Sequence, residues 1–181
     1  MEEPTAVQTL NLSAGVNWVS TFVEITLADL QDALANALPG TQIMIQGMDG
    51  YTTYNGVRWR GSLNSLDVVQ MYMITVASSC EITLEGMPID PAEHPITIRN
   101  GVNWIGFPFQ ADMAISDAFA GFAVANDMVQ GSEGYTTYNG TRWRGSLSNL
   151  VPGRGYLYNS AASENRTLVF PAPSKARKMK P

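Results

Sequence analysis

Two stretches of this 181-residue chain carry tyrosine, threonine and arginine in the same order. Residues 50–63 read GYTTYNGVRWRGSL and residues 134–147 read GYTTYNGTRWRGSL, so only Val57 and Thr141 differ. Guanidinium groups bind carboxylates and phosphates through paired hydrogen bonds, and tyrosine rings offer flat faces for stacking. Residues of these types in this pattern suit the binding of a sugar, a carboxylate or a phosphate.

Each stretch also predicts a β-hairpin. Asn-Gly supplies the two positive φ angles of a type I′ turn, whose twist matches the flanking strands. A two-residue turn would place Tyr54 opposite Val57 and leave one face of the hairpin for solvent or a partner. The candidate ligand-binding residues on that face are Tyr51, Thr53, Arg58 and Arg60 in the first copy and Tyr135, Thr137, Arg142 and Arg144 in the second.

A purely structural role for the motif is also open from the sequence, with the aromatic rings packing the fold and the arginines merely solvated. Against it, the motif is nearly identical in both copies, whereas the segments around it have diverged. Packing tolerates the exchange of one apolar residue for another, so retention of the arginines and threonines indicates a shared surface task or a recent gene conversion. Two copies would provide two-site binding.

Other residues with chemical reactivity are scarce. Cys80 is the only cysteine, and His94 is the only histidine and stands in a proline-bounded segment that reads as a linker. We therefore predict no intrachain disulfide, no metal site and no cofactor. The sequence also contains no Gly-rich phosphate loop and no arrangement of nucleophile, base and orienting acid, so we predict that the protein is not an enzyme.

The similarity between the two stretches extends to a whole unit. Gly-Val-Asn-Trp at 15–18 returns at 101–104, which indicates that a complete unit was duplicated. Because a unit of about 80 residues would make only a small core alone, we expect the two units to pack as one compact domain about an approximate twofold axis. The predicted organisation is unit 1 over residues 6–88, unit 2 over residues 94–172, and a basic flexible tail or linker over residues 173–181.

Within each unit the pattern predicts a strand, a helix and then several strands. Residues 10–22 form two strand segments broken by a turn, and Leu27 to Leu38 form a short amphipathic helix. The counterpart at 115–122 contains Gly121 and should be shorter. Further strands are expected at 42–46, in the motif, at 70–77 and at 81–85. The fold class is mainly β, a tandem pseudo-twofold repeat of a small β-barrel or sheet unit with one short helix per repeat.

The charge distribution limits the classes of partner. Residues 1–174 contain seven arginines and sixteen acidic residues, a balance of −9, and all three lysines lie beyond them. An acidic body argues against nucleic acid as a partner. No run of eighteen apolar residues is present, so no membrane span is expected. The N-terminus MEEPTAVQ is acidic and unlike a secretory signal, which leaves a cytoplasmic protein or an excised mature segment.

The order of these motifs invites a comparison with a known module. Gly-Val-Asn-Trp is followed by Gly-Tyr-Thr-Thr-Tyr and Trp-Arg-Gly-Ser-Leu, then by LEGMP at 84–88, HPITI at 94–98 and the second Gly-Val-Asn-Trp. Over about residues 9–171 this order resembles a duplicated β-rich module of large secreted or surface proteins of Bacteroidetes. Such modules usually have tryptophan where this chain has Val16 and Val102, so the match is to the general pattern.

The resemblance implies an extracellular accessory module attached to other domains of a longer polypeptide, with no catalytic residues to carry over. It moves the expected location to secreted or cell surface, with cytoplasmic as the alternative. Together with the repeated motif it predicts a non-catalytic binding module for which a glycan is the expected ligand. The alternative is a structural spacer or assembly module that makes protein–protein contacts and has no small-molecule ligand.

Overall fold

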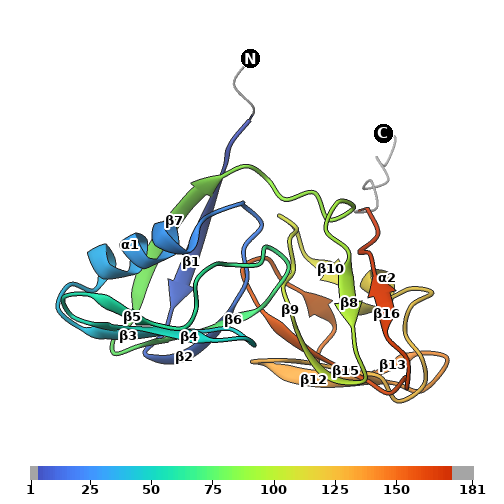
Figure 1. The fold of residues 1–181 in the computed structure, drawn as a ribbon. Coiled ribbons are helices and arrows are strands. Elements are labelled where there is room, and N and C mark those ends of the chain that lie inside the picture. Colours follow the sequence, from blue (N-terminus) through green and yellow to red (C-terminus); the bar gives the residue numbers. More distant parts are fainter. Residues whose placement is uncertain (1–3, 173–181) are drawn as a thin grey trace.

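The structure, a computed structural model, describes residues 4–172 and consists mainly of β-strands (Figure 1). The predicted basic tail at 173–181 lies outside the described residues. The elements of unit 1 are β1 (Ala6–Leu12), β2 (Gly15–Val19), α1 (Leu27–Ala37), β3 (Gln42–Gln46), β4 (Tyr51–Asn55), β5 (Trp59–Gly61), β6 (Tyr72–Val76) and β7 (Cys80–Gly86).

Unit 2 repeats this order with two short strands added. Its elements are β8 (Ile96–Ile98), β9 (Gly101–Ile105), β10 (Met113–Ala114), α2 (Ile115–Ala118), β11 (Met128–Gly131), β12 (Gly134–Tyr138), β13 (Trp143–Gly145), β14 (Asn149–Leu150), β15 (Tyr156–Ser160) and β16 (Arg166–Leu168). The five-stranded sheets have the orders β2-β6-β3-β4-β5 and β9-β15-β11-β12-β13, and β1-β7 matches β8-β16. The predicted mainly-β tandem repeat is confirmed.

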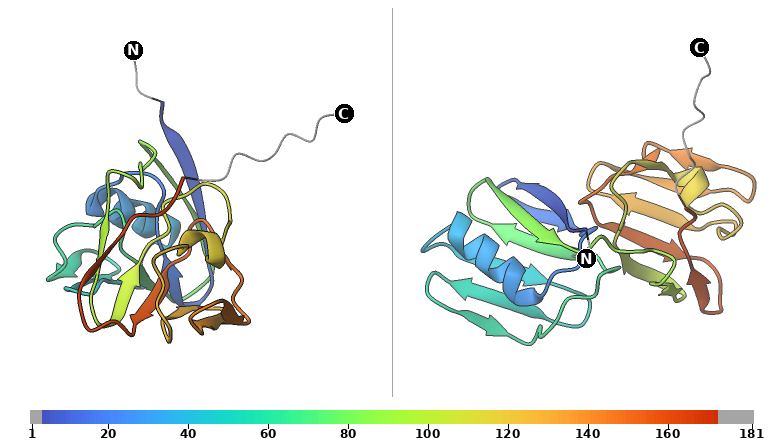
Figure 2. Two further views of the ribbon diagram at one scale, coloured as in Figure 1. Left: turned by 90° about the vertical axis from the view of Figure 1, so that its right-hand side faces the viewer. Right: turned by 90° about the horizontal axis from the view of Figure 1, so that it is seen from above.

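Each five-stranded sheet buries one face in a hydrophobic core of its own. In unit 1, α1 and the β1-β7 pair lie over the sheet, and Leu34, Ile45 and Ile74 are fully buried between these layers (Figure 2). The core of unit 2 is built around Phe107 and Phe119. The apolar interior therefore consists of two clusters rather than one continuous core, and the cluster of unit 2 also includes Val69 from unit 1.

The two helices differ because their first turns differ. In α1, the Thr26 side chain accepts a hydrogen bond from the Asp29 N–H at 3.1 Å, and the Asp29 carboxylate accepts one from the Thr26 N–H at 2.8 Å. This capping box satisfies N–H groups that the helix itself leaves unpaired. Helix α2 has no side-chain cap and spans four residues, with Gly121 at φ 71° shortly after it. The prediction of a shorter second helix is confirmed.

The predicted two-residue hairpin turn is wrong. Tyr54 pairs with Trp59 and Thr53 with Arg60, so the turn is longer than the Asn-Gly pair. The Asn55 side chain determines this geometry, because its Oδ1 accepts hydrogen bonds from the N–H groups of residues 57 and 58 at 3.0 and 2.9 Å. Such side-chain turns are typical of asparagine. The register moves by two residues, so the predicted faces are unchanged along the strands.

Within residues 4–172 the units are joined by three backbone hydrogen bonds, of which two are equivalent and the third runs from the Gly155 N–H to the Trp18 carbonyl at 3.1 Å. The Ser20 N–H donates to the Gly153 carbonyl at 3.1 Å, and the Gly106 N–H donates to the Val69 carbonyl at 2.7 Å. Ser20 and Gly106 follow the matching strands β2 and β9, whereas Val69 and Gly153 precede the matching strands β6 and β15. Such reciprocal contacts are those of a twofold interface. We call this junction the seam.

Side-chain contacts strengthen the seam on one side only. The Ser20 hydroxyl donates to the Arg154 carbonyl at 2.6 Å and accepts from the Phe107 N–H at 3.0 Å, while Ser20 is 1% exposed. The backbone of unit 2 comes so close that a Cβ on Gly155 would overlap the Met71 side chain. The seam therefore depends on small residues and hydrogen bonds.

None of the helices within residues 4–172 has the length and apolar character needed to cross a membrane.

Replacement of Ser20 by alanine should weaken the seam. It leaves the buried Phe107 N–H and Arg154 carbonyl without the hydroxyl, so we expect the free energy of unfolding to fall by about 1–3 kcal/mol. Urea denaturation followed by circular dichroism measures this change. Ser65→Ala on an exposed loop is the control, and equal midpoints for the two variants would contradict the importance of the Ser20 hydroxyl.

Candidate functional site

Each five-stranded sheet presents a second face that points away from its core, and we call these the outer faces. Both lie on the lower side of the molecule in Figure 1, opposite α1, β8 and β16. The strand registers give the outer face of unit 1 as Val16, Trp18, Met44, Gln46, Tyr51, Thr53, Arg60, Met73 and Thr75. That of unit 2 comprises Val102, Trp104, Met128, Gln130, Tyr135, Thr137, Arg144, Leu157 and Asn159.

One row of residues crosses each outer face. In unit 1, Trp18 pairs with Met73, Met73 with Gln46, and Gln46 with Tyr51, so these side chains stand on four neighbouring strands. Strands are spaced about 4.8 Å apart, which places the tryptophan and tyrosine about 14 Å from each other across the glutamine. The matching row in unit 2 is Trp104, Leu157, Gln130 and Tyr135. Tyr51 and Tyr135 are 52% and 56% exposed.

The structure brings most of the predicted site residues together. Tyr51, Thr53 and Arg60 lie on the outer face of unit 1, and Tyr135, Thr137 and Arg144 lie on that of unit 2. The two remaining arginines, Arg58 and Arg142, lie in the hairpin turns and do not join these faces. Each outer face therefore carries one arginine, whereas the sequence predicts two.

Sequence reasoning missed the other end of the face. Trp18 and Gln46 belong to strands that are distant in sequence from the hairpin, and both recur in unit 2 as Trp104 and Gln130. Their recurrence at the same places in the two copies was the available signal. The outer faces differ in only two positions, where Met73 and Thr75 are replaced by Leu157 and Asn159.

Several buried positions have changed in chemical character between the units. At matching core positions, unit 1 has Ile43, Ile74, Val76 and Ile82, and unit 2 has Asp127, Tyr158, Ser160 and Arg166. An aliphatic cluster in one copy thus corresponds to a polar network in the other. The duplicated fold tolerates this change in part of its interior, while most outward residues stay the same.

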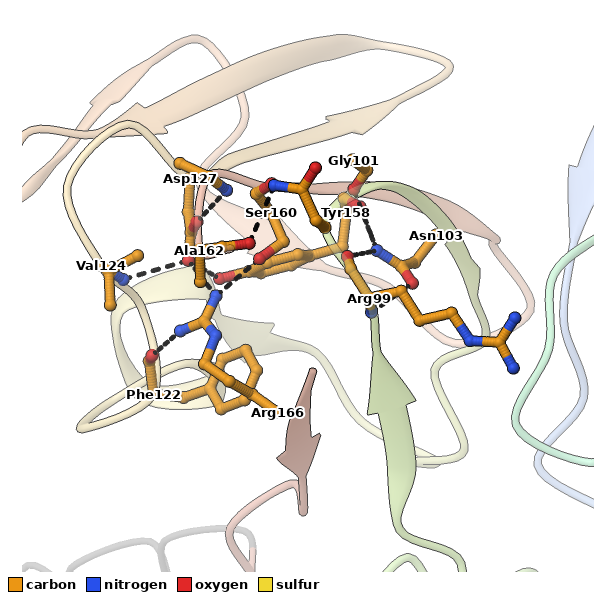
Figure 3. A network of polar contacts seen from close by, with 12 residues as sticks. Arg99, Gly101, Asn103, Phe122, Val124, Asp127, Tyr158, Ser160, Ala162 and Arg166 are labelled. Atoms are coloured by element: carbon orange, nitrogen blue, oxygen red, sulfur yellow. Dashed lines mark hydrogen bonds and ion pairs between the residues drawn. The ribbon is translucent and has the colours of Figure 1, made fainter. Parts of the chain in front are cut away.

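The polar network of unit 2 is centred on the Asp127 carboxylate, which is completely buried (Figure 3). It accepts hydrogen bonds from the Tyr158 hydroxyl at 2.5 Å and from Arg166 Nη2 at 2.8 Å, and also from the N–H groups of Val124 and Ala161. The Arg166 guanidinium carbon lies 4.3 Å from the centre of the Phe122 ring. The network ties the segment after α2 to β15 and β16.

Hydrogen bonding determines the ionisation of this network. Burial works to raise the pKa of Asp127, but the hydrogen bonds from Tyr158 and Arg166 outweigh it and hold the pKa below its ordinary value. Burial, and next the Asp127 carboxylate, raise the pKa of the Tyr158 phenol. The pair therefore stays a carboxylate and a neutral phenol over a wide pH range, as befits a structural cluster.

The remaining reactive side chains lie apart from one another. Cys80 is half-buried on β7, and burial raises the pKa of its thiol. His94 Nε2 lies 3.7 Å from a carboxylate oxygen of Glu24. Within residues 4–172, no group of three or more His, Cys, Asp or Glu side chains could hold a metal ion. The outer faces are thus the arrangement with the clearest capacity for binding.

No protein-family model, no curated protein and no solved structure matches this chain. The resemblance to modules of Bacteroidetes surface proteins therefore stays a prediction.

Replacement of Arg166 by isoleucine, the residue of unit 1 at this position, should destabilise unit 2. It leaves the Asp127 carboxylate buried without its counter-charge, and removal of one partner from a buried ion pair costs about 3–5 kcal/mol. Chemical denaturation measures the loss. Arg99→Ile, on an exposed arginine, should change the unfolding free energy by less than about 0.5 kcal/mol. Similar losses in both variants would contradict a specific role for the ion pair.

The stability of the wild type should also fall in acid. Because the pKa of Asp127 is lower in the folded protein than its ordinary value of 3.8, its ionisation stabilises the fold above that value, and the contribution is lost as the pH falls below it. In Arg166→Ile the carboxylate has lost one of these hydrogen bonds, so the stability difference between wild type and variant should shrink from pH 7 to pH 3. Denaturation curves at several pH values test this, and a constant difference would contradict it.

Proposed function

We propose that this protein is a non-catalytic binding module whose two outer faces bind a glycan. The observation that carries the proposal is the contrast between the two surfaces of the duplicated sheet. Several buried residues differ in chemical character between the units, such as Ile43 and Asp127 or Ile74 and Tyr158, whereas tryptophan, glutamine, tyrosine, threonine and arginine recur on the outer faces. A requirement of packing alone would act on the interior first, so the shared outward residues favour a shared ligand.

The chemistry of the outer face suits a sugar chain. The rings of Trp18 and Tyr51 can stack against the apolar faces of sugar rings, and the Gln46 amide between them can donate and accept hydrogen bonds with hydroxyl groups. Neither outer face carries a lysine, an aspartate or a glutamate, and each carries one arginine. This composition favours an uncharged polysaccharide over a cationic ligand.

The arrangement of the units supports simultaneous use of both faces. The seam joins the sheets side by side, and both outer faces lie on the same side of the molecule (Figure 1). A long polymer could therefore contact both rows at once. When two sites engage one molecule, the second contact is intramolecular and the overall affinity exceeds that of either site.

A protein partner is the second candidate. Val16 and Val102 are 60% and 51% exposed, and methionines lie beside them on the outer faces. Tryptophan, tyrosine, methionine and arginine are the residues enriched in protein–protein interfaces. The outer strands β5 and β13 are also sheet edges, which can pair with another chain. These features favour an assembly module.

The double variant Tyr51→Ala/Tyr135→Ala should lose most of its glycan binding. Each exposed ring removed costs about 0.5–1.5 kcal/mol, so the two losses together should lower the affinity for a polysaccharide about tenfold or more. The measurement is a screen on immobilised neutral polysaccharides, followed by calorimetry with the best soluble ligand. The single variant Tyr51→Ala should retain binding at one face and lose the gain from two-site contact.

Matched controls separate a specific face from a general charge effect. Arg60→Ala/Arg144→Ala removes two arginines from the outer faces, and Arg58→Ala/Arg99→Ala removes two exposed arginines that lie elsewhere. Only the first pair should weaken binding, with thermal melts unchanged in both. Two results together would contradict the glycan proposal and favour a protein partner. The wild type would bind no polysaccharide, and it would self-associate in sedimentation experiments in a manner that Tyr51→Ala/Tyr135→Ala abolishes.

A further inference from the structure

Unit 2 has a groove that lies away from its outer face. The groove has a volume of about 490 Å³ and separates α2 and the segment after it from the β12-β13 hairpin. Its lining includes the rings of Phe119, Tyr138 and Trp143, the hydroxyls of Ser116 and Thr136, and Arg142. Trp143 is the centre of the aromatic group, with ring centroids 5.8 Å from Phe119 and 5.2 Å from Tyr138.

In unit 1 the Gln31 side chain contacts Thr52, the residue that matches Thr136 of the groove. Helix α1 has eleven residues and α2 has four. From α1, Gln31 Nε2 donates a hydrogen bond to Thr52 Oγ1 at 3.4 Å. The shared Asp-Ala pair that follows aligns Gln31 with Ser116, whose side chain is much shorter. The groove of unit 2 thus lies where unit 1 places a polar group against its threonine.

The polar groups of the groove differ in their surroundings, and the Thr141 hydroxyl donates a hydrogen bond to Asn139 Oδ1 at 2.9 Å. Thr136, the counterpart of Thr52, lines the groove and is 1% exposed. The Arg142 side chain is exposed and forms no ion pair with an acidic residue of the described chain.

The only difference between the two copies of the motif also lies at this groove. Thr141 lines it, and the counterpart in unit 1 is Val57, which is 83% exposed. The exchange of valine for threonine adds a hydroxyl beside Arg142. The motif has therefore changed at the one position that makes the mouth of the groove more polar.

We propose that this groove binds a hexuronate, a sugar ring that carries a carboxylate. The apolar face of the ring would lie against Trp143, a ring hydroxyl would take the place of the Gln31 amide at Thr136, and the carboxylate would bind the guanidinium of Arg142. The three kinds of group in the groove thus match the three kinds of group in the ligand. This site is separate from the outer faces and does not depend on their function.

Titrations with galacturonate and galactose test the proposal, because the two sugars differ only in the carboxylate. The readout is the NMR signal of the Trp143 indole N–H, assigned with Trp143→Phe. Galacturonate should shift this signal in a saturable manner, and galactose should bind about tenfold more weakly or worse, because a hydrogen bond between charged groups is lost. Trigalacturonate is added as a third ligand, and tighter binding than the monomer would identify the end of an acidic polysaccharide as the source of the uronate.

Two variants and their matched controls locate the site. Ser116→Gln restores the side chain of unit 1 and should abolish the shift by filling the groove, and Arg142→Ala should weaken galacturonate binding about tenfold. The controls are Arg58→Ala, at the matching turn of unit 1, and Tyr51→Ala/Tyr135→Ala on the outer faces. Both should bind galacturonate as the wild type does. Thermal melts establish that all variants are folded.

The proposal is overturned if no saturable shift occurs, if galactose and galacturonate bind equally, or if Arg58→Ala weakens binding as much as Arg142→Ala. It is likewise overturned if Ser116→Gln is folded and binds unchanged. If Tyr51→Ala/Tyr135→Ala loses polysaccharide binding but still binds galacturonate, the groove and the outer faces are separate sites.

Discussion

Three backbone hydrogen bonds across the seam, two of them equivalent, determine how the two sheets are placed. The Ser20 N–H and the Gly106 N–H each follow an edge strand, and each donates to the carbonyl of a loop in the other unit. These directional bonds, unlike apolar contact, fix the position of one sheet relative to the other. The two hydrophobic clusters are separate, although Val69 of unit 1 belongs to the cluster of unit 2 and adds apolar contact across the seam. The seam thus explains why both outer faces lie on the same side of the molecule.

The sequence was informative wherever a local pattern decides the structure. The duplication, the helix that begins at Leu27, its shorter counterpart and the position of Tyr51 and Arg60 on one face of the hairpin all follow from periodicity and repetition, but which face points outward does not. The turn length was not predictable from Asn-Gly alone, because the Asn55 side chain replaces a backbone hydrogen bond. The row that begins at Trp18 depends on the insertion of β6 between β2 and β3, which is a pairing between segments far apart in the chain. The seam uses backbone groups, which leave almost no trace in residue types.

The two interiors show that one backbone can be stabilised in two ways. Aliphatic side chains such as Ile43 pack without directional demands, whereas the Asp127 network must satisfy each donor and acceptor. The Asp127 network also holds the segment after α2 in place, because Arg166 donates a hydrogen bond to the Phe122 carbonyl at 2.5 Å. Ala123 in that segment lines the groove of unit 2. A change in the core is therefore connected with the segment that lines the groove of the second unit.

The first and last strands of each unit pair with each other. Ala6 lies opposite Gly86 in unit 1, and Ile96 lies opposite Leu168 in unit 2, so the chain leaves each unit beside the point at which it entered. Elements with adjacent ends can be inserted, removed or multiplied in a polypeptide with little disturbance to the chain on either side. The two ends of each unit therefore lie side by side. A second copy could be joined in tandem without altering the fold of the first, which explains in physical terms how a whole unit could be duplicated and still fold.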